Sequence, residues 1–187
     1  MIAVRYRSQS LAGRRAAYDH GSMSGRITIP ENLFVGIDHV GIAVPDLDEA
    51  IAFYSGTFGM EVRHRETNAE QGVREAMIGV GSDREGPCLQ LLAPIDDSST
   101  IAKFLDRSGP GLQQLAYRVT DLDEVSAVLR ERGLRLLYDA PRGGTAGSRI
   151  NFVHPKDAGG VLVELVEPAA ETGEVGHTGL TPDVTGE

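Results

Sequence analysis

A repeated segment places strong limits on how this chain can fold. Residues 39–49 read HVGIAVPDLDE, and residues 114–124, which lie 75 positions later, read QLAYRVTDLDE. In both copies, alternating apolar residues of the strand type run into an Asp-Leu-Asp-Glu sequence that is typical of a helix start. The match continues downstream, where residues 59–62 correspond to residues 133–136. Two such copies predict two similar modules that pack as one unit.

Each copy predicts the same order of secondary structure. The helices are expected to begin at the N-caps Asp46 and Asp121 and to end at Gly59 and Gly133. The strand candidates are 37–44, 60–66, 72–80 and 87–93 in the first module. In the second they are the repeat of the first strand, which begins near Gln114, and residues 134–138, 148–153 and 160–166. A short helix near residues 100–107 would join the modules. The fold class is therefore α+β, with two paired βαβββ modules that form a curved, open, barrel-like trough.

The two ends of the chain differ from the repeat in composition. Residues 1–33 carry five arginines against two acidic residues, and we expect a disordered N-terminal extension, with a transit peptide or docking arm as the alternative. The folded domain is predicted at 34–168, with module one at about 36–95 and module two at about 111–168. Residues 169–187 contain acidic residues but no lysine or arginine, which predicts a flexible acidic tail.

Composition excludes several classes of protein. The 187 residues carry a formal net charge of −9 without a basic stripe, which argues against a nucleic-acid binder. No apolar run approaches the roughly 20 residues that a membrane-spanning helix needs. The single cysteine excludes an intramolecular disulfide. We therefore expect a cytoplasmic protein that binds a small molecule and neither nucleic acid nor a membrane.

Four polar residues lie inside otherwise apolar strands at positions that the repeat relates. His39 corresponds to Gln114 in the first strands, and Gln90 corresponds to Glu164 in the last strands. A polar group that faces a core without a partner is costly, and one divalent metal ion would serve all four residues. An imidazole, two amides and a carboxylate suit Co²⁺, Mn²⁺, Mg²⁺ or Zn²⁺. The alternative is that these side chains face solvent on the outer side of the sheet.

A further acidic residue, Glu75, shares a predicted strand face with the apolar Val73 and Met77. Burial would raise the pKa of this carboxyl and a nearby cation would lower it. A carboxylate with a pKa balanced in this way can act as a general base. The alternative is an exposed strand glutamate.

Six stretches together give a resemblance to a known family. They are IDHV at 37–40, EQGV at 70–73, QLLAP at 90–94, STIA at 99–102, RINFVHPK at 149–156 and VLVEL at 161–165. In these stretches, residues 34–168 resemble the methylmalonyl-CoA epimerases of the vicinal oxygen chelate superfamily, a family built from paired βαβββ modules. The resemblance implies that His39, Gln90 and Glu164 bind a divalent metal, Co²⁺ first, and that Glu75 and Glu164 transfer protons. Gln114 stands where many members carry histidine, which implies a weaker fourth ligand.

The reaction that the resemblance implies inverts C2 of methylmalonyl-CoA through a metal-stabilised enolate. An acyl-CoA substrate and a homodimer are implied with it. The CoA phosphates need cations, for which Arg142, Arg149 and Lys156 are candidates around the glycine-rich stretch 143–147. Solvated surface charges are the alternative for these three residues.

Other functions stay open on the same fold. A glyoxalase-type metal-dependent isomerase would more usually carry glutamate at the position of Gln90. A metal-free ligand-binding protein would need none of the four polar strand residues. An extradiol dioxygenase needs a second histidine in its iron site, and Gln114 removes it.

Overall fold

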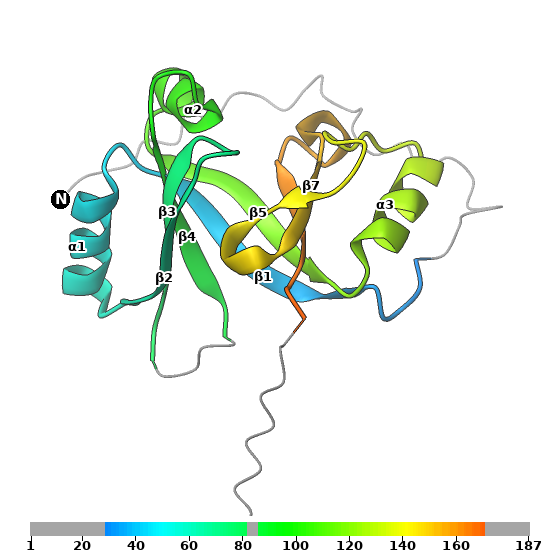
Figure 1. Cartoon of the computed structure of the whole chain (residues 1–187), viewed down its shortest axis with the longest axis horizontal. Coiled ribbons are helices and arrows are strands. Elements are labelled where there is room, and N and C mark those ends of the chain that lie inside the picture. The colour runs from blue at the N-terminus through cyan, green and yellow to red at the C-terminus, as the bar shows by residue number, and fades with distance from the viewer. Residues whose placement is uncertain (1–28, 82–85, 171–187) are drawn as a thin grey trace, which may run out of the picture.

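The computed structural model describes residues 29–81 and 86–170, which form a curved sheet flanked by helices (Figure 1). The strands are β1 (Phe34–Ala43), β2 (Glu61–Asn68), β3 (Val73–Gly79), β4 (Cys88–Pro94), β5 (Gly111–Val119), β6 (Arg142–Gly143), β7 (Arg149–Val153) and β8 (Val163–Glu167). The helices are α1 (Leu47–Phe58), α2 (Thr100–Ser108) and α3 (Leu122–Glu131), with short 3₁₀ turns η1 (Thr145–Gly147) and η2 (Pro155–Asp157). The α+β fold that the repeat predicts is confirmed.

The sheet has the order β2-β3-β4-β1-β5-β8-β7-β6, which reads as the same four-strand arrangement from either edge. The two central strands, β1 and β5, pair antiparallel, while β1 pairs parallel with β4 and β5 pairs parallel with β8. The two modules are therefore related as the repeat indicates. The strands that carry the four related polar residues, β4, β1, β5 and β8, are neighbours at the centre of the sheet.

The helices begin and end where the sequence predicts. The Asp46 carboxylate accepts hydrogen bonds from the first backbone N–H groups of α1, and Asp121 does the same for α3. Gly59 follows α1 with φ +65° and Gly133 follows α3 with φ +82°, a conformation that glycine adopts without strain. Figure 1 shows α1 and α3 on the outer sides of the two halves of the sheet. Two apolar clusters lie under these helices, and two more, which include Leu92 and Phe152, lie beside polar side chains on the concave face.

One strand prediction is wrong. Residues 134–138 form no strand, and only Leu136 makes a single bridge, to Val153. The side chain of Asn151 accepts a hydrogen bond from the Tyr138 N–H and donates one to the Tyr138 carbonyl. Because this amide replaces the backbone partner, the chain leaves the sheet there, and the edge strand of the module is the two-residue β6.

The packed part of the chain also begins earlier than the expected boundary at residue 34. Leu33 is 2% exposed in the core under α3, and its carbonyl accepts a hydrogen bond from the Thr120 N–H. The rest of the expected extension, residues 1–28, and most of the expected tail, residues 171–187, lie outside the described residues. No helix in the described ranges is long and apolar enough to cross a membrane.

Candidate functional site

The four related polar residues meet on the concave face of the sheet. His39, Gln90, Gln114 and Glu164 are each between 3% and 5% exposed, so none of them faces solvent on the outer side. Each comes from a different one of the four central strands. Their convergence follows from the module symmetry, while their role as metal ligands stays a prediction.

The four side chains are joined by hydrogen bonds around one point. Glu164 Oε2 accepts a hydrogen bond from Gln114 Nε2 and lies 3.1 Å from His39 Nε2. The same Gln114 Nε2 donates to Gln90 Oε1 over 3.1 Å. The amide of Gln114 thus presents its N–H₂ group to the centre of the site, between a carboxylate oxygen and an amide oxygen.

A glycine makes room for this arrangement. Gly41 lies directly opposite Gln114 across the β1–β5 pair. A Cβ atom at Gly41 would lie 2.4 Å from Gln114 Cγ, which is closer than two carbon atoms that are not bonded to each other can approach. Any larger residue at this position would therefore displace Gln114 from the site.

His39 is held by a carboxylate that the sequence analysis did not single out. Its Nδ1 lies 2.9 Å from Asp38 Oδ1, and Asp38 Oδ2 accepts a hydrogen bond from Arg118 Nε over 2.7 Å. Burial alone would lower the pKa of His39, but the hydrogen bonds to Asp38 and Glu164 raise it to about 9. Because Asp38 occupies Nδ1, the ring presents Nε2 to the site.

Glu75 is buried in the site and not exposed, so the alternative of a solvated strand glutamate is excluded. It is 1% exposed, and its two oxygens accept hydrogen bonds from Thr145 Oγ1 over 2.8 Å and from Gln90 Nε2 over 3.0 Å. Burial raises the pKa of Glu75 to about 7, opposed by the Thr145 hydrogen bond and reinforced by Glu66 and Glu164. The carboxyl group can therefore change protonation state near neutral pH.

The glycine-rich loop between β6 and β7 reaches across to the first module. Thr145 accepts a hydrogen bond from Gln90 Nε2 over 2.8 Å besides donating to Glu75, and the Ala146 N–H donates to Glu66. Both N–H groups of the Gln90 amide are thereby used, which directs Gln90 Oε1 to the centre of the site. Sequence reasoning missed Thr145 because its partners lie in the other module.

The donor set fits a divalent cation. The described residues contain no cluster of three or more His, Cys, Asp or Glu side chains that could hold a metal, because two of the four members are amides. The buried Glu164 carboxylate, His39 Nε2 and Gln90 Oε1 nevertheless face one point, and the outward groups of His39 and Gln90 are already bonded elsewhere. A carboxylate, an imidazole and an amide oxygen suit a cation of intermediate hardness. Gln114 would ligate through its oxygen only after its amide rotates.

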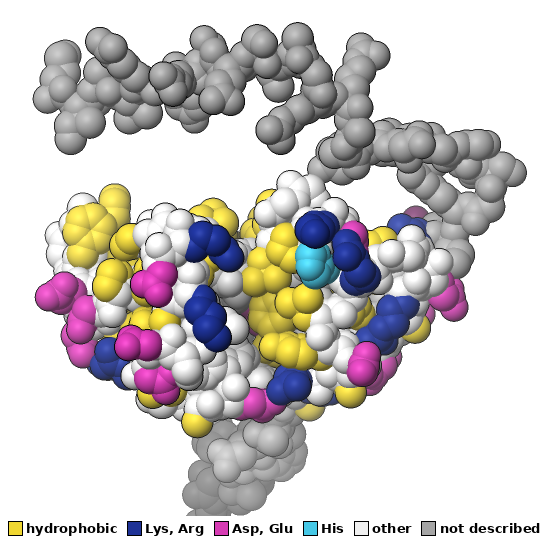
Figure 2. All heavy atoms as spheres, turned by 90° about the horizontal axis from the view of Figure 1, so that it is seen from above, with side chains coloured by type: hydrophobic (Ala, Val, Ile, Leu, Met, Phe, Trp, Pro, Cys, Tyr) yellow, Lys and Arg dark blue, Asp and Glu magenta, His cyan; other side chains and the backbone are white. Residues whose placement is uncertain are grey.

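A cavity of about 190 Å³ opens beside Gln114. Its walls include the apolar side chains of Leu92, Phe152 and Leu162, and Gln113 also lines it. The Gln113 Oε1 atom is buried without a hydrogen-bond partner among the described residues. Figure 2, which looks onto the end of the molecule where α2 lies, shows apolar side chains around a hollowed centre with Lys and Arg side chains on both sides.

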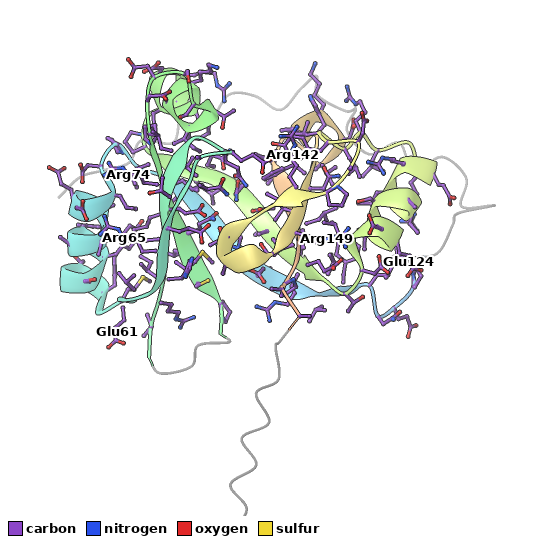
Figure 3. The ribbon with its side chains drawn as sticks, in the orientation of Figure 1. Glu61, Arg65, Arg74, Glu124, Arg142 and Arg149 are labelled. Atoms are coloured by element: carbon purple, nitrogen blue, oxygen red, sulfur yellow. The ribbon has the colours of Figure 1, made fainter. Side chains whose placement is uncertain are left out.

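The three candidate phosphate contacts differ in their surroundings. Arg142 forms an ion pair with Glu70 over 3.0 Å, and its guanidinium lies 4.3 Å from the centre of the Tyr138 ring. Arg149, lower on the same hairpin in Figure 3, is paired with both Asp123 and Glu167. Arg149 is therefore already paired with acidic side chains of α3 and β8, and its role toward phosphates stays a prediction.

Lys156 lies in the turn η2, where its backbone N–H donates to His154 Nδ1. His154 is thereby a loop hydrogen-bond partner, as its position before Pro155 suggests. The roles of Arg142 and Lys156 toward phosphates stay predictions.

Comparison with known proteins gives consistent matches. The model of the Glyoxalase/Bleomycin resistance protein/Dioxygenase superfamily matches residues 38–152. An ethylmalonyl-CoA/methylmalonyl-CoA epimerase of Cereibacter sphaeroides is 37% identical over 131 residues, which cover 69% of this chain and 95% of the relative. The human mitochondrial methylmalonyl-CoA epimerase is 35% identical over 130 residues, which cover 69% of this chain and 72% of the relative.

Solved structures match over the same region. A methylmalonyl-CoA epimerase from Mycobacterium tuberculosis has a TM-score of 0.71 and 56% identity, covering 78% of this chain and 95% of that protein. A variant of the Streptomyces coelicolor methylmalonyl-CoA epimerase in complex with 2-nitronate-propionyl-CoA has a TM-score of 0.70 and 48% identity, covering 73% of this chain and 99% of that protein.

Proposed function

This chain belongs to the Glyoxalase/Bleomycin resistance protein/Dioxygenase superfamily, and from that membership and the geometry of its concave site we infer that it interconverts the 2R and 2S forms of methylmalonyl-CoA. One observation carries the inference. Two buried carboxylates, Glu75 from the first module and Glu164 from the second, lie at the two ends of a chain of hydrogen bonds through the amides of Gln90 and Gln114.

The residue types follow from the chemistry of the substrate. The C2–H bond lies between a thioester carbonyl and a carboxylate, so its proton is acidified. Inversion requires that a base removes this proton from one face and that an acid returns a proton to the other face. One carboxylate cannot reach both faces, and the two modules supply one each. Glu75 takes the proton in one direction and gives it in the other, and Glu164 has the opposite role.

We propose that His39, Gln90 and Glu164 hold a divalent cation, with Gln114 as a weaker fourth ligand. The family resemblance favours Co²⁺, with Mn²⁺, Mg²⁺ or Zn²⁺ as alternatives. When bound, such a cation would act as a Lewis acid toward the thioester oxygen and the substrate carboxylate. Asp38 holds His39, while Glu75 and Thr145 hold Gln90, so the two side chains are oriented before any ligand arrives.

The cavity beside Gln114 is the proposed path for the CoA arm. Its apolar walls suit the alkyl parts of pantetheine, and the unpaired Gln113 Oε1 can accept a hydrogen bond from a pantetheine amide. Arg142, whose partners Glu70 and Tyr138 line this cavity, and Lys156 are the proposed phosphate contacts. A homodimer is expected from the family resemblance, and light scattering of the purified protein measures it.

A solvent-exchange experiment tests the function. The protein is incubated in heavy water with (2R)- or (2S)-methylmalonyl-CoA, with and without a chelator. Deuterium entry at C2 together with inversion, lost on chelation and restored by Co²⁺, is the expected result. Turnover of the methylglyoxal–glutathione adduct without exchange into methylmalonyl-CoA would instead support the glyoxalase-type isomerase.

A further inference from the structure

The two buried carboxylates stand at the boundary between two cavities. On β3, Val73, Glu75 and Met77 are two positions apart, so their side chains point to the same face of the sheet. Val73 lines the cavity beside Gln114, whereas Met77 lines a second cavity, of about 160 Å³. Glu75 therefore lies between the two cavities along β3.

Strand β8 repeats this arrangement around Glu164. Leu162, which directly precedes the strand, lines the cavity beside Gln114, and Val166 lines the second cavity. Glu164 lies midway between Leu162 and Val166 in the sequence and itself lines the second cavity. A carbon atom that exchanges protons with both carboxylates must lie at this boundary, so the groups that it carries extend to either side.

The walls of the second cavity suit a hydrocarbon group. The side chains of Met77, Val166 and Pro168 contribute apolar surface to it. Asp38 and Arg118 also line it, and they are paired with each other over 2.7 Å. An alkyl group therefore contacts carbon atoms here, whereas a charged group would compete with an existing ion pair.

We propose that the second cavity receives the alkyl group at C2 of a 2-alkylmalonyl-CoA and that Met77 sets the longest alkyl group that the enzyme accepts. The inference rests on the proposed function, because it takes the CoA arm to run through the cavity beside Gln114. With the arm on that side of C2, the alkyl group extends to the other side, where it contacts Met77 from the first module and Val166 from the second.

The size of the second cavity fits this class of substrate. A volume of about 160 Å³ has room for about five groups of the size of a water molecule, which is more than a methyl group fills. The half-buried side chain of Met77 is unbranched and flexible, so it can occupy the space that a short alkyl group leaves. A longer alkyl group has to displace this side chain, and Met77 thereby limits the length.

The test compares substrates that differ only in the alkyl group. The measured quantity is kcat/KM for C2 inversion of butylmalonyl-CoA divided by that of methylmalonyl-CoA, on one enzyme preparation. This ratio does not depend on the fraction of folded or metal-loaded enzyme. Met77→Ala should raise it at least roughly tenfold, because one methylene in an apolar pocket changes kcat/KM by about 10- to 200-fold. Val166→Leu adds volume to the same cavity and should lower the corresponding ratio for ethylmalonyl-CoA by roughly tenfold.

A matched control lies on the same strand, on the other side of Glu75. Val73→Ala alters the wall of the cavity beside Gln114, along the CoA arm that all these substrates share, so the ratios should stay within about twofold of the parent enzyme. Unchanged ratios in Met77→Ala and Val166→Leu, or a changed ratio in Val73→Ala instead, would overturn the inference while leaving the proposed function intact. Absence of inversion of every one of these substrates by the parent enzyme would refute the proposed function and the inference with it.

Discussion

Replacement of Asp38 by asparagine tests whether His39 is held for metal binding. In the folded protein, Asp38 accepts hydrogen bonds at both oxygens, from His39 Nδ1 over 2.9 Å and from Arg118 Nε over 2.7 Å. Its side chain is 10% exposed, so solvent cannot replace these bonds well. Asparagine keeps the shape and one oxygen but loses the charge, and its N–H₂ group faces one of the two donors.

The expected loss can be estimated from these contacts. A hydrogen bond to a charged group contributes about 1.5–3 kcal/mol net, so the free energy of unfolding of the metal-free protein should fall by about 2 kcal/mol. The pKa of His39 should also fall, because the Asp38 hydrogen bond is one of the contacts that raise it. A residue that orients a metal-binding histidine typically contributes about 10- to 100-fold to metal affinity. The Kd for Co²⁺ should rise by that factor.

Titration calorimetry with Co²⁺ and urea unfolding with chelator measure the two effects. The control is Asp48→Asn, since Asp48 also pairs with an arginine, Arg65, but both side chains are about half exposed or more. Such a surface pair contributes less than about 1 kcal/mol, and this control should keep the affinity for Co²⁺. Equal Co²⁺ affinity in Asp38→Asn and the parent protein would refute the role given to Asp38.

Three further predictions concern the centre of the site. Gly41→Ala should displace Gln114 and lower both Co²⁺ affinity and turnover, whereas Gly36→Ala, where a Cβ meets nothing within 4 Å, should leave both unchanged. Gln114→His should raise Co²⁺ affinity in calorimetry by about tenfold, or about 1.4 kcal/mol, because imidazole is the better ligand; unchanged affinity would exclude a ligand at this position. In the metal-free protein the pKa of His39 is about 9 against 6.5 when unfolded, so its stabilising contribution is complete below about pH 6.5 and is lost as the pH rises through about 9. Urea unfolding with chelator from pH 6 to 10 should show this fall, and His39→Asn should remove it.

Much of the fold could be predicted from the sequence because the repeat marks equivalent positions. The offset that relates His39 to Gln114 and Gln90 to Glu164 identified four side chains that the pseudo-symmetric sheet then brings together. The ends of the helices α1 and α3 could also be predicted, because an aspartate N-cap and a terminal glycine stabilise a helix end through backbone groups only a few residues away. Glu75 was found by its acidic character on an apolar face.

The contacts that cross between modules could not be predicted in the same way. Thr145 contacts Glu75 from a loop that lies 70 residues away in the sequence, and no hydrophobic periodicity predicts such a contact. The role of Asn151 in ending the expected strand depends on a side chain that replaces a backbone partner.

The most direct test of the two-carboxylate account is stereospecific exchange by Glu75→Gln. In heavy water this variant should no longer invert methylmalonyl-CoA, with a loss of at least roughly 100-fold. It should still exchange the C2 proton of one epimer, the one whose proton faces Glu164, as followed by NMR. Inversion at the rate of the parent enzyme, or equal exchange into both epimers, would contradict the account.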